Sequence, residues 1–203
     1  MNDVHLIAEL LKSADNIEIF THIHPDGDAL GSSYALSAAL KKLSKKVKVT
    51  VNDVLPEDFS YIHSVDRLEF SPSFTVSVDV ASMSLLGDFP EERVIDLAID
   101  HHLNNTTRSR EVFCDPSRAA CGEIIFEIIE ALGVELDRYM AECLYTAIAT
   151  DTGCFKFSNT TSRTFETASR LCRYAENGNF GYLNTQLFIS PQNDNHYLHF
   201  SYG

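Results

Sequence analysis

Residues 21–32 read THIHPDGDALGS and directly follow the short apolar run Ile17–Phe20. The β-branched and aromatic residues of that run are typical of a buried strand, and residues 30–43 have the apolar spacing of a helix. The stretch therefore predicts a strand, a loop and a helix, with the loop at the C-terminal end of the strand. In open α/β sheets, ligands bind at that end of the strands.

The loop carries one imidazole and two carboxylates, those of His22, Asp26 and Asp28, within seven residues. Because Pro25 fixes φ and Gly27 tolerates a positive φ, we expect the loop to turn all three toward one point. Two carboxylates that close together require a cation, which predicts a metal site. The tetrapeptide Pro-Asp-Gly-Asp alone is more typical of an ordinary turn with solvated aspartates, and the rest of the chain reverses that preference.

The composition describes a globular chain. Of its 203 residues 44% are apolar, enough for a sizeable core in one domain or one and a half. The N-terminus has no basic leader, and no apolar run approaches the roughly 18 residues of a membrane span, so we expect a cytoplasmic protein without a membrane partner. The net charge of −13 argues against long duplex nucleic acid as a partner.

The five cysteines are odd in number and include no C-x-x-C pair. Neither a disulfide framework nor a zinc ribbon is therefore indicated, and we interpret them as bystander thiols.

Apolar periodicity predicts an α/β fold, with a mostly parallel sheet and helices on both faces. The first helix is amphipathic and spans Val4–Leu11. We expect further strands at 47–51, 74–78 and 94–99, a short helix near 56–63, a loop as far as Ala120, and helices at 121–132, 138–149, 164–176 and 180–189. Residues from Ser190 onward show no clear periodicity.

Three of the apolar runs end on aspartate or histidine. His22 follows the first run, Asp79 follows residues 74–78, and Asp100-His101-His102 follows residues 94–99. Parallel strands place their C-terminal ends side by side, so we expect these side chains to converge on one site.

Asp151 is a further candidate ligand, from a different element. It lies at the end of the helix expected over 138–149, where Gly153 stops the helix.

Four motifs in order carry a resemblance to the DHH phosphoesterase superfamily, and they span residues 21 to about 160. They are His22-x-x-x-Asp26-x-Asp28, the lone Asp79, Asp100-His101-His102, and Thr150-Asp151-Thr152-Gly153-x-Phe155. Within the superfamily the chain most resembles the bacterial oligoribonuclease (nanoRNase) and 3′-phosphoadenosine-5′-phosphate phosphatase group.

The resemblance implies a site for two divalent metal ions. His22 and Asp26 would hold one ion, Asp28, His101 and Asp151 would hold the other, and Asp79 would bridge both. Oxygen ligands with few imidazoles suit Mn²⁺ or Mg²⁺, and the two histidines favour Mn²⁺. Two such ions can share a hydroxide and stabilise an in-line displacement at phosphorus, which is phosphoester hydrolysis.

Other roles come from the same resemblance. His102 is expected to face the substrate phosphate as a catalytic group, with a structural histidine as the alternative, and Asp100 to hold an imidazole in orientation. Asn105 and Arg108 follow closely enough to contact phosphate oxygens, although a solvated surface role is equally open for Arg108. His24 stands where many relatives carry asparagine, and we interpret it as a bystander.

The expected domains are a DHH catalytic domain over residues 1–189 and the start of a linker, or a truncated end, over 190–203. Relatives continue into a C-terminal substrate-binding domain, which is absent from this sequence. The resemblance implies very short RNA oligonucleotides or 3′,5′-bisphosphonucleosides as substrates. A homodimer is a possible assembly.

Two alternatives remain. A family II inorganic pyrophosphatase shares the metal motifs but usually carries threonine where this chain has Gly27. The other is a metal-binding domain that is not fully active without its C-terminal domain.

Overall fold

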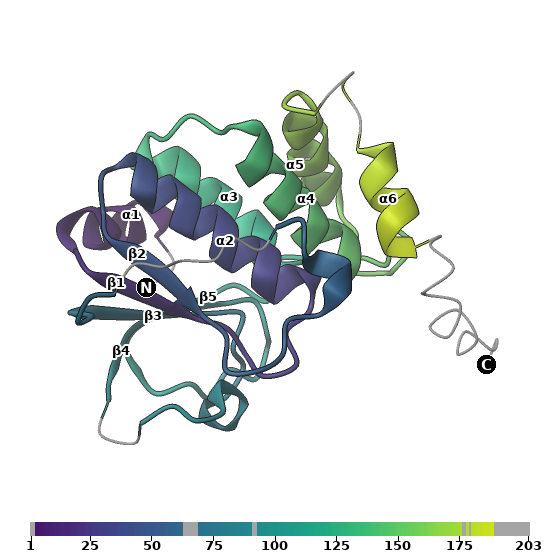
Figure 1. Cartoon of the computed structure of the whole chain (residues 1–203). Coiled ribbons are helices and arrows are strands. Elements are labelled where there is room, and N and C mark those ends of the chain that lie inside the picture. The colour runs from purple at the N-terminus through teal and green to yellow at the C-terminus, as the bar shows by residue number, and fades with distance from the viewer. Residues whose placement is uncertain (1–2, 63–68, 91–92, 176–177, 179, 189–203) are drawn as a thin grey trace.

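The computed structural model describes residues 3–62, 69–90, 93–175, 178 and 180–188. Five parallel strands form one sheet in the order β2-β1-β3-β4-β5, and helices cover it (Figure 1). The strands are β1 (Ile17–Phe20), β2 (Val47–Thr50), β3 (Phe74–Val78), β4 (Ile95–Asp100) and β5 (Ser109–Cys114). The predicted α/β class with a parallel sheet is confirmed.

The helices are α1 (Val4–Ser13), α2 (Gly27–Lys42), α3 (Cys121–Leu132), α4 (Arg138–Asp151), α5 (Ser162–Cys172) and α6 (Gly181–Phe188), with short 3₁₀ turns η1 (Glu57–Phe59) and η2 (Met83–Leu86). Three predicted helices, at 56–63, 164–176 and 180–189, each end on a residue outside the described part of the chain. The segment from Ser190 onward also lies outside it. Among the described helices, none is long and apolar enough to cross a membrane.

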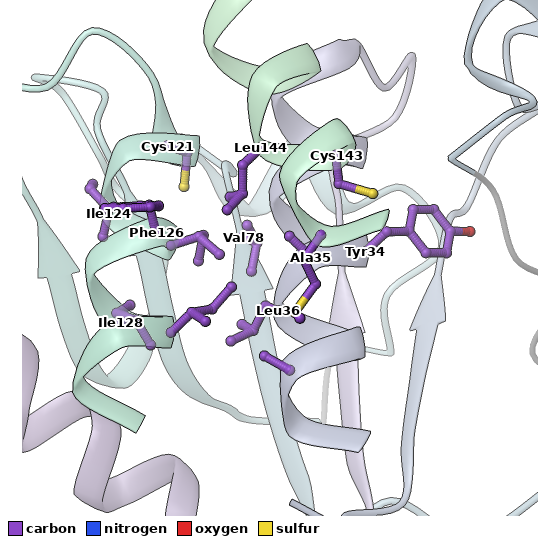
Figure 2. Packing of buried hydrophobic residues seen from close by; sticks show 14 of the residues in the cluster. Tyr34, Ala35, Leu36, Val78, Cys121, Ile124, Phe126, Ile128, Cys143 and Leu144 are labelled. Atoms are coloured by element: carbon purple, nitrogen blue, oxygen red, sulfur yellow. The ribbon is translucent and has the colours of Figure 1, made fainter. Parts of the chain in front are cut away.

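The main core lies between one face of the sheet and the helices. Side chains of α1, α2 and α3 share it with the strand residues Ile19, Val78 and Ile99, and α4 packs on α2 and α3 (Figure 2). Burial of these apolar side chains is the main favourable term in folding.

The opposite face of the sheet is covered differently from the expectation of helices on both faces. The segment after β3, including η2, covers it around a small cluster of Phe20, Val80, Leu86 and Ile95. The face is partly polar, since the buried Glu18 contacts Thr50 at 2.7 Å, Lys48 at 2.9 Å and Arg93. A face with such ion pairs offers little apolar area for an amphipathic helix.

Strand β5 was not predicted, because residues 103–119 were expected to form a loop. It is an edge strand that pairs only with β4, and its Phe113 is buried while Arg110 and Glu111 are exposed. Because so few side chains of β5 are buried, its sequence lacks the alternation of apolar and polar residues from which strands are predicted.

Helix α2 begins at Gly27, three residues earlier than expected, and α4 extends to Asp151. Gly27 is helical without a positive φ, so the expected reason for its presence was wrong. The actual reason is steric, since a Cβ on Gly27 would lie 2.5 Å from Thr150 Cγ2. Gly31 is tighter still, because a Cβ there would lie 2.3 Å from the backbone oxygen of Cys143. Helices α2 and α4 therefore approach closely.

Substitution Gly31→Ala should destabilise the protein, because the new methyl must displace a backbone carbonyl rather than a flexible side chain. Alanine gains up to about 1 kcal/mol in helix propensity, but overpacking typically costs about 1–3 kcal/mol and can cost more at such a short distance. We expect a net loss of about 1–2 kcal/mol in the free energy of unfolding by urea. Ala38→Ser on the same helix is the control and should change it by less than about 0.5 kcal/mol. A Gly31→Ala variant as stable as the wild type would contradict the close packing.

Candidate metal centre

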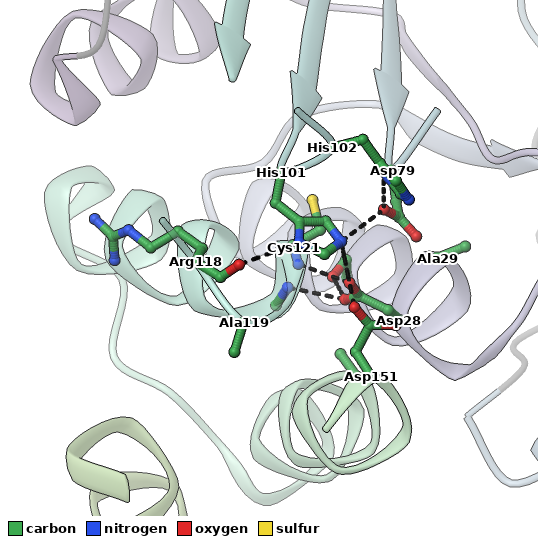
Figure 3. A network of polar contacts seen from close by, with 12 residues as sticks. Asp28, Ala29, Asp79, His101, His102, Arg118, Ala119, Cys121 and Asp151 are labelled. Carbon is green, nitrogen blue, oxygen red and sulfur yellow. Dashed lines mark hydrogen bonds and ion pairs between the residues drawn. The ribbon is translucent and has the colours of Figure 1, made fainter. Parts of the chain in front are cut away.

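The carboxyl ends of the strands bring the expected ligands together (Figure 3). His22 follows β1, Asp79 follows β3 and His101 follows β4. Asp26 caps the N-terminus of α2, where its side chain accepts a hydrogen bond from the Ala29 backbone N–H at 3.0 Å. The remaining two are Asp28 in the first turn of α2 and Asp151 at the last residue of α4.

Asp79 lies between two groups of donor atoms. Its Oδ2 is 3.8 Å from His22 Nε2, and its Oδ1 is 3.6 Å from His101 Nε2. One group of ligand atoms, all within 4.8 Å of one another, comes from His22, Asp26 and Asp79. A second such group comes from Asp28, His101 and Asp151. Each carboxylate oxygen of Asp79 therefore faces a different group.

The backbone at Asp79 is unusual. Its φ is +58°, a region that costs most residues energy but that aspartate tolerates better than most. The side chain is buried, and its Oδ1 has no hydrogen-bond partner among the described residues. A strained and buried carboxylate with an unpaired oxygen is expected where a bound cation completes the site.

The two imidazoles are oriented for ligation. Nδ1 of His22 lies 2.8 Å from the backbone oxygen of Ile23, and Nδ1 of His101 lies 3.2 Å from that of Arg118. A carbonyl oxygen only accepts, so each Nδ1 carries a hydrogen and each ring turns its Nε2 toward the carboxylates. Each Nε2 lies 3.3–3.8 Å from carboxylate oxygens, a spacing that fits a cation between them.

Arg118 supports this arrangement through its backbone oxygen, which contacts His101, while its guanidinium binds other residues. Its guanidinium donates to Asp115 at 2.7 Å and to both oxygens of Glu127 at 2.5 and 2.8 Å. These bonds fix the backbone carbonyl on which His101 depends. Sequence reasoning missed Arg118, because no pattern of spacing links it to His101.

Asp28 is held by the N-terminus of α3. Its carboxylate accepts hydrogen bonds from the backbone N–H groups of Cys121 at 2.6 Å and Gly122 at 2.9 Å, and from Ser32 Oγ at 2.9 Å. The positive end of a helix dipole favours a carboxylate there. The bonds to α3 connect residues more than 90 positions apart, so no sequence pattern predicts them.

The cluster carries excess negative charge. Burial raises the pKa of Asp28 and of Asp79 well above the ordinary value, and neighbouring carboxylates raise both further. Burial also raises the pKa of Asp151, although the nearby His101 opposes this rise. Buried carboxylates that also raise one another's pKa are stabilised by divalent cations, so the residues present fit a metal centre.

Asp100, His102 and Asn105 form one hydrogen-bonded unit beside the cluster. The buried Asp100 accepts from His102 Nδ1 at 2.8 Å, and this bond raises the pKa of the half-exposed His102 ring. Asp100 thus orients an imidazole, as the sequence suggested.

Asn105 does not have the placement that the sequence suggested. Its amide nitrogen donates to Asp100 Oδ2 and to the backbone oxygen of Val80 at 2.9 Å, while its amide oxygen accepts from the Thr107 N–H at 2.9 Å. Both N–H donors are therefore used, and neither is left for a phosphate oxygen. Asn105 holds Asp100 in place.

Arg108 lies away from the cluster, so the expectation that it contacts the same phosphate is not met. It lines a pocket with Met83, Arg93 and Arg110 at the start of β4 and β5. Strand β4 has six residues, so its two ends are about 16 Å apart at about 3.3 Å per residue. Ser109 pairs with Ile95, so the chain has returned to the start of β4 only seven residues after His102, which sequence proximity conceals.

His24 is also outside the donor groups. Its ring is exposed, and its Nδ1 lies 2.9 Å from Asp53 Oδ2. The five cysteines, all within the described residues, form no disulfide.

Adding Mn²⁺ to protein freed of metal by EDTA should raise its melting temperature, because a cation bound only to the native state stabilises it by mass action. At a hundredfold excess over the dissociation constant one site contributes about 2.7 kcal/mol, which corresponds to roughly 5–10 °C for a chain of this size. NaCl at equal ionic strength is the control. An unchanged midpoint, with bound metal demonstrated by dialysis, would contradict a shared carboxylate site.

A family model described as "DHH family, N-terminal domain" matches residues 16–148. A protein of Thermus thermophilus named "Bifunctional oligoribonuclease and PAP phosphatase NrnA" is 37% identical over 84% of this chain and 54% of its own length. This chain spans about half the length of the curated relatives it matches.

Two solved structures have the same fold. An exopolyphosphatase-related protein from Bacteroides fragilis has a TM-score of 0.82 at 21% identity, over 92% of this chain and 60% of that one. A putative family II inorganic pyrophosphatase from Methanococcus jannaschii has a TM-score of 0.62 at 23% identity, over 84% and 60%. These two structures show the fold, and the family match, which covers more than half of the sequence, shows the family. The chain belongs to the DHH family.

Proposed function

We propose that this chain holds two divalent metal ions and hydrolyses phosphoester bonds in very short RNA oligonucleotides or 3′,5′-bisphosphonucleosides. The observation that carries the proposal is the placement of Asp79, whose two oxygens face two separate groups of ligands. The name of the Thermus relative, an oligoribonuclease and PAP phosphatase, supports the choice of substrates.

His22, Asp26 and Asp79 would hold one ion, and Asp28, His101, Asp151 and Asp79 would hold the other. Four carboxylates offset the charge of two divalent ions, and the mixture of oxygen and imidazole ligands favours Mn²⁺ over Mg²⁺. When bound, the two ions would supply Lewis acidity toward a phosphoryl oxygen and a stronger nucleophile from water.

His102 is the residue of this chain that we assign to the substrate phosphate. Its ring borders the cluster, with Nδ1 3.5 Å from Asp79 Oδ1, and remains about half exposed. Because its bond to Asp100 raises its pKa, the ring keeps its positive charge to a higher pH than an ordinary histidine. A cationic donor at this position can bind a phosphate oxygen and position the ester.

A pyrophosphatase is the second candidate. Family II enzymes usually carry threonine at the position of Gly27, and here the space for such a side chain is closed by Thr150, whose Oγ1 would lie 2.6 Å from an added Cβ. This closed position favours the nucleotide substrates over pyrophosphate.

Three substrates distinguish the readings: a dinucleotide, a 3′,5′-bisphosphonucleoside and pyrophosphate, each with Mn²⁺ in excess. We expect release of mononucleotide or phosphate from the first two, at a rate at least about tenfold above that from pyrophosphate. A faster reaction with pyrophosphate would favour the pyrophosphatase. Tight metal binding with no turnover of any of the three would favour a metal-binding domain that is not active by itself.

Substitution Asp79→Asn should remove most of both metal ions, whereas His22→Ala should remove one, because only Asp79 faces both groups. Asparagine tolerates the positive φ at this position, so the fold should persist. Elemental analysis after desalting gives the number of ions per chain. Asp53→Asn is the matched control, since Asp53 contacts His24 outside the cluster. Equal metal content in the Asp79 and His22 variants would contradict the bridging role.

A further inference from the structure

A second group of charged side chains lies at the opposite end of β4 and β5 from the metal centre. A pocket of about 290 Å³ is lined by Met83, Arg93, Val94, Arg108, Ser109 and Arg110. Three guanidinium groups thus surround one cavity in a chain whose net charge is −13. This concentration of positive charge has no part in the proposed metal chemistry.

Arg93 is held rigidly in the wall of the pocket. It donates to Glu18 and to Thr75 Oγ1 at 3.1 Å. Its guanidinium carbon lies 5.2 Å from the ring centroid of Phe20 and 5.8 Å from that of Phe89. These stacking contacts and hydrogen bonds hold the guanidinium of Arg93 in one orientation, so its remaining N–H groups are also fixed in orientation.

Arg110 is the second residue of β5, Arg108 directly precedes this strand, and both line the pocket. Arg110 is 2.9 Å from Asp96, whereas Arg108 is exposed and makes no ion pair with the residues that the structure describes. Arginine has five N–H donors, so one carboxylate partner does not exhaust Arg110.

The charges around the pocket do not balance among the described residues. Glu18 is shared between Arg93 and Lys48, Asp96 pairs with Arg110, and Arg108 adds a further cation. Among the described residues that line the pocket, three are arginines and none is an acid, and Arg93 and Arg110 each pair with one carboxylate. The excess positive charge, in a concave site with prepositioned donors, is the arrangement that anions bind.

We propose that this pocket binds a phosphate group, either free inorganic phosphate or the phosphate of a nucleotide. Guanidinium groups match the geometry of phosphate oxygens and form paired, charge-assisted hydrogen bonds with them. Met83 and Val94 close the pocket on its apolar side. Because the pocket lies at the start of β4 and β5 and includes none of the proposed metal ligands, phosphate binds here without metal.

The test uses the full chain after treatment with EDTA, so that phosphate cannot bind through metal ions. Inorganic phosphate is titrated while backbone amide shifts are followed by NMR, in the wild type, in Arg108→Ala and in Arg173→Ala. Arg173 lies beyond the end of α5, so its removal is a matched loss of one positive charge elsewhere. Binding should be saturable, with the largest shifts at Val94, Ser109 and Arg110.

The affinity should fall by at least about tenfold in Arg108→Ala, as expected for the loss of charge-assisted hydrogen bonds, and should change less than about twofold in Arg173→Ala. Repeating the titration with a nucleoside 5′-monophosphate distinguishes the two ligands. An affinity about tenfold higher than that for inorganic phosphate identifies a nucleotide, and equal affinity identifies free phosphate. Equal phosphate affinity in the wild type and Arg108→Ala, shifts confined to the metal centre, or no saturation would overturn the proposal. Since no metal or turnover is involved, failure here is separate from failure of the proposed hydrolysis.

Discussion

The structure depends on one electrostatic constraint, which is the burial of Asp79 among other carboxylates. Its pKa is raised by burial first and then by neighbouring acids, and its Oδ1 lacks a hydrogen-bond partner among the described residues. Such a group costs free energy unless a cation compensates it. The imidazoles and carboxylates around Asp79 offer the ligands that such a cation requires.

The fold meets this constraint by combining elements that are distant in sequence. Parallel strands deliver His22, Asp79 and His101 at one edge of the sheet. The close packing of α2 on α4, which the glycines of α2 permit, brings Asp28 and Asp151 to the same point. The N-terminus of α3 then holds Asp28 in place. Packing of the helices is thus a condition for assembling the donor atoms.

The parallel sheet and most of the candidate ligands could be predicted from the sequence, because parallel strands that end on Asp or His bring those residues together at their carboxyl ends. Contacts between elements that are distant in sequence could not be predicted in this way. Strand β5 lacks apolar alternation, and Gly27 is required by the position of Thr150 rather than by its own φ. Arg108 follows the DHH motif in sequence, yet the chain crosses to the far end of the sheet before reaching it. Proximity in sequence is a poor guide wherever a connection reverses direction.

The central claim is that Asp79 bridges two metal ions, and anomalous X-ray scattering from crystals grown with Mn²⁺ tests it most directly. Data collected on both sides of the manganese absorption edge locate the ions independently of any assumed ligand. The account predicts two anomalous peaks about 3.5–4 Å apart, one on each side of the Asp79 carboxylate. A single peak, or two peaks of which only one contacts Asp79, would contradict it.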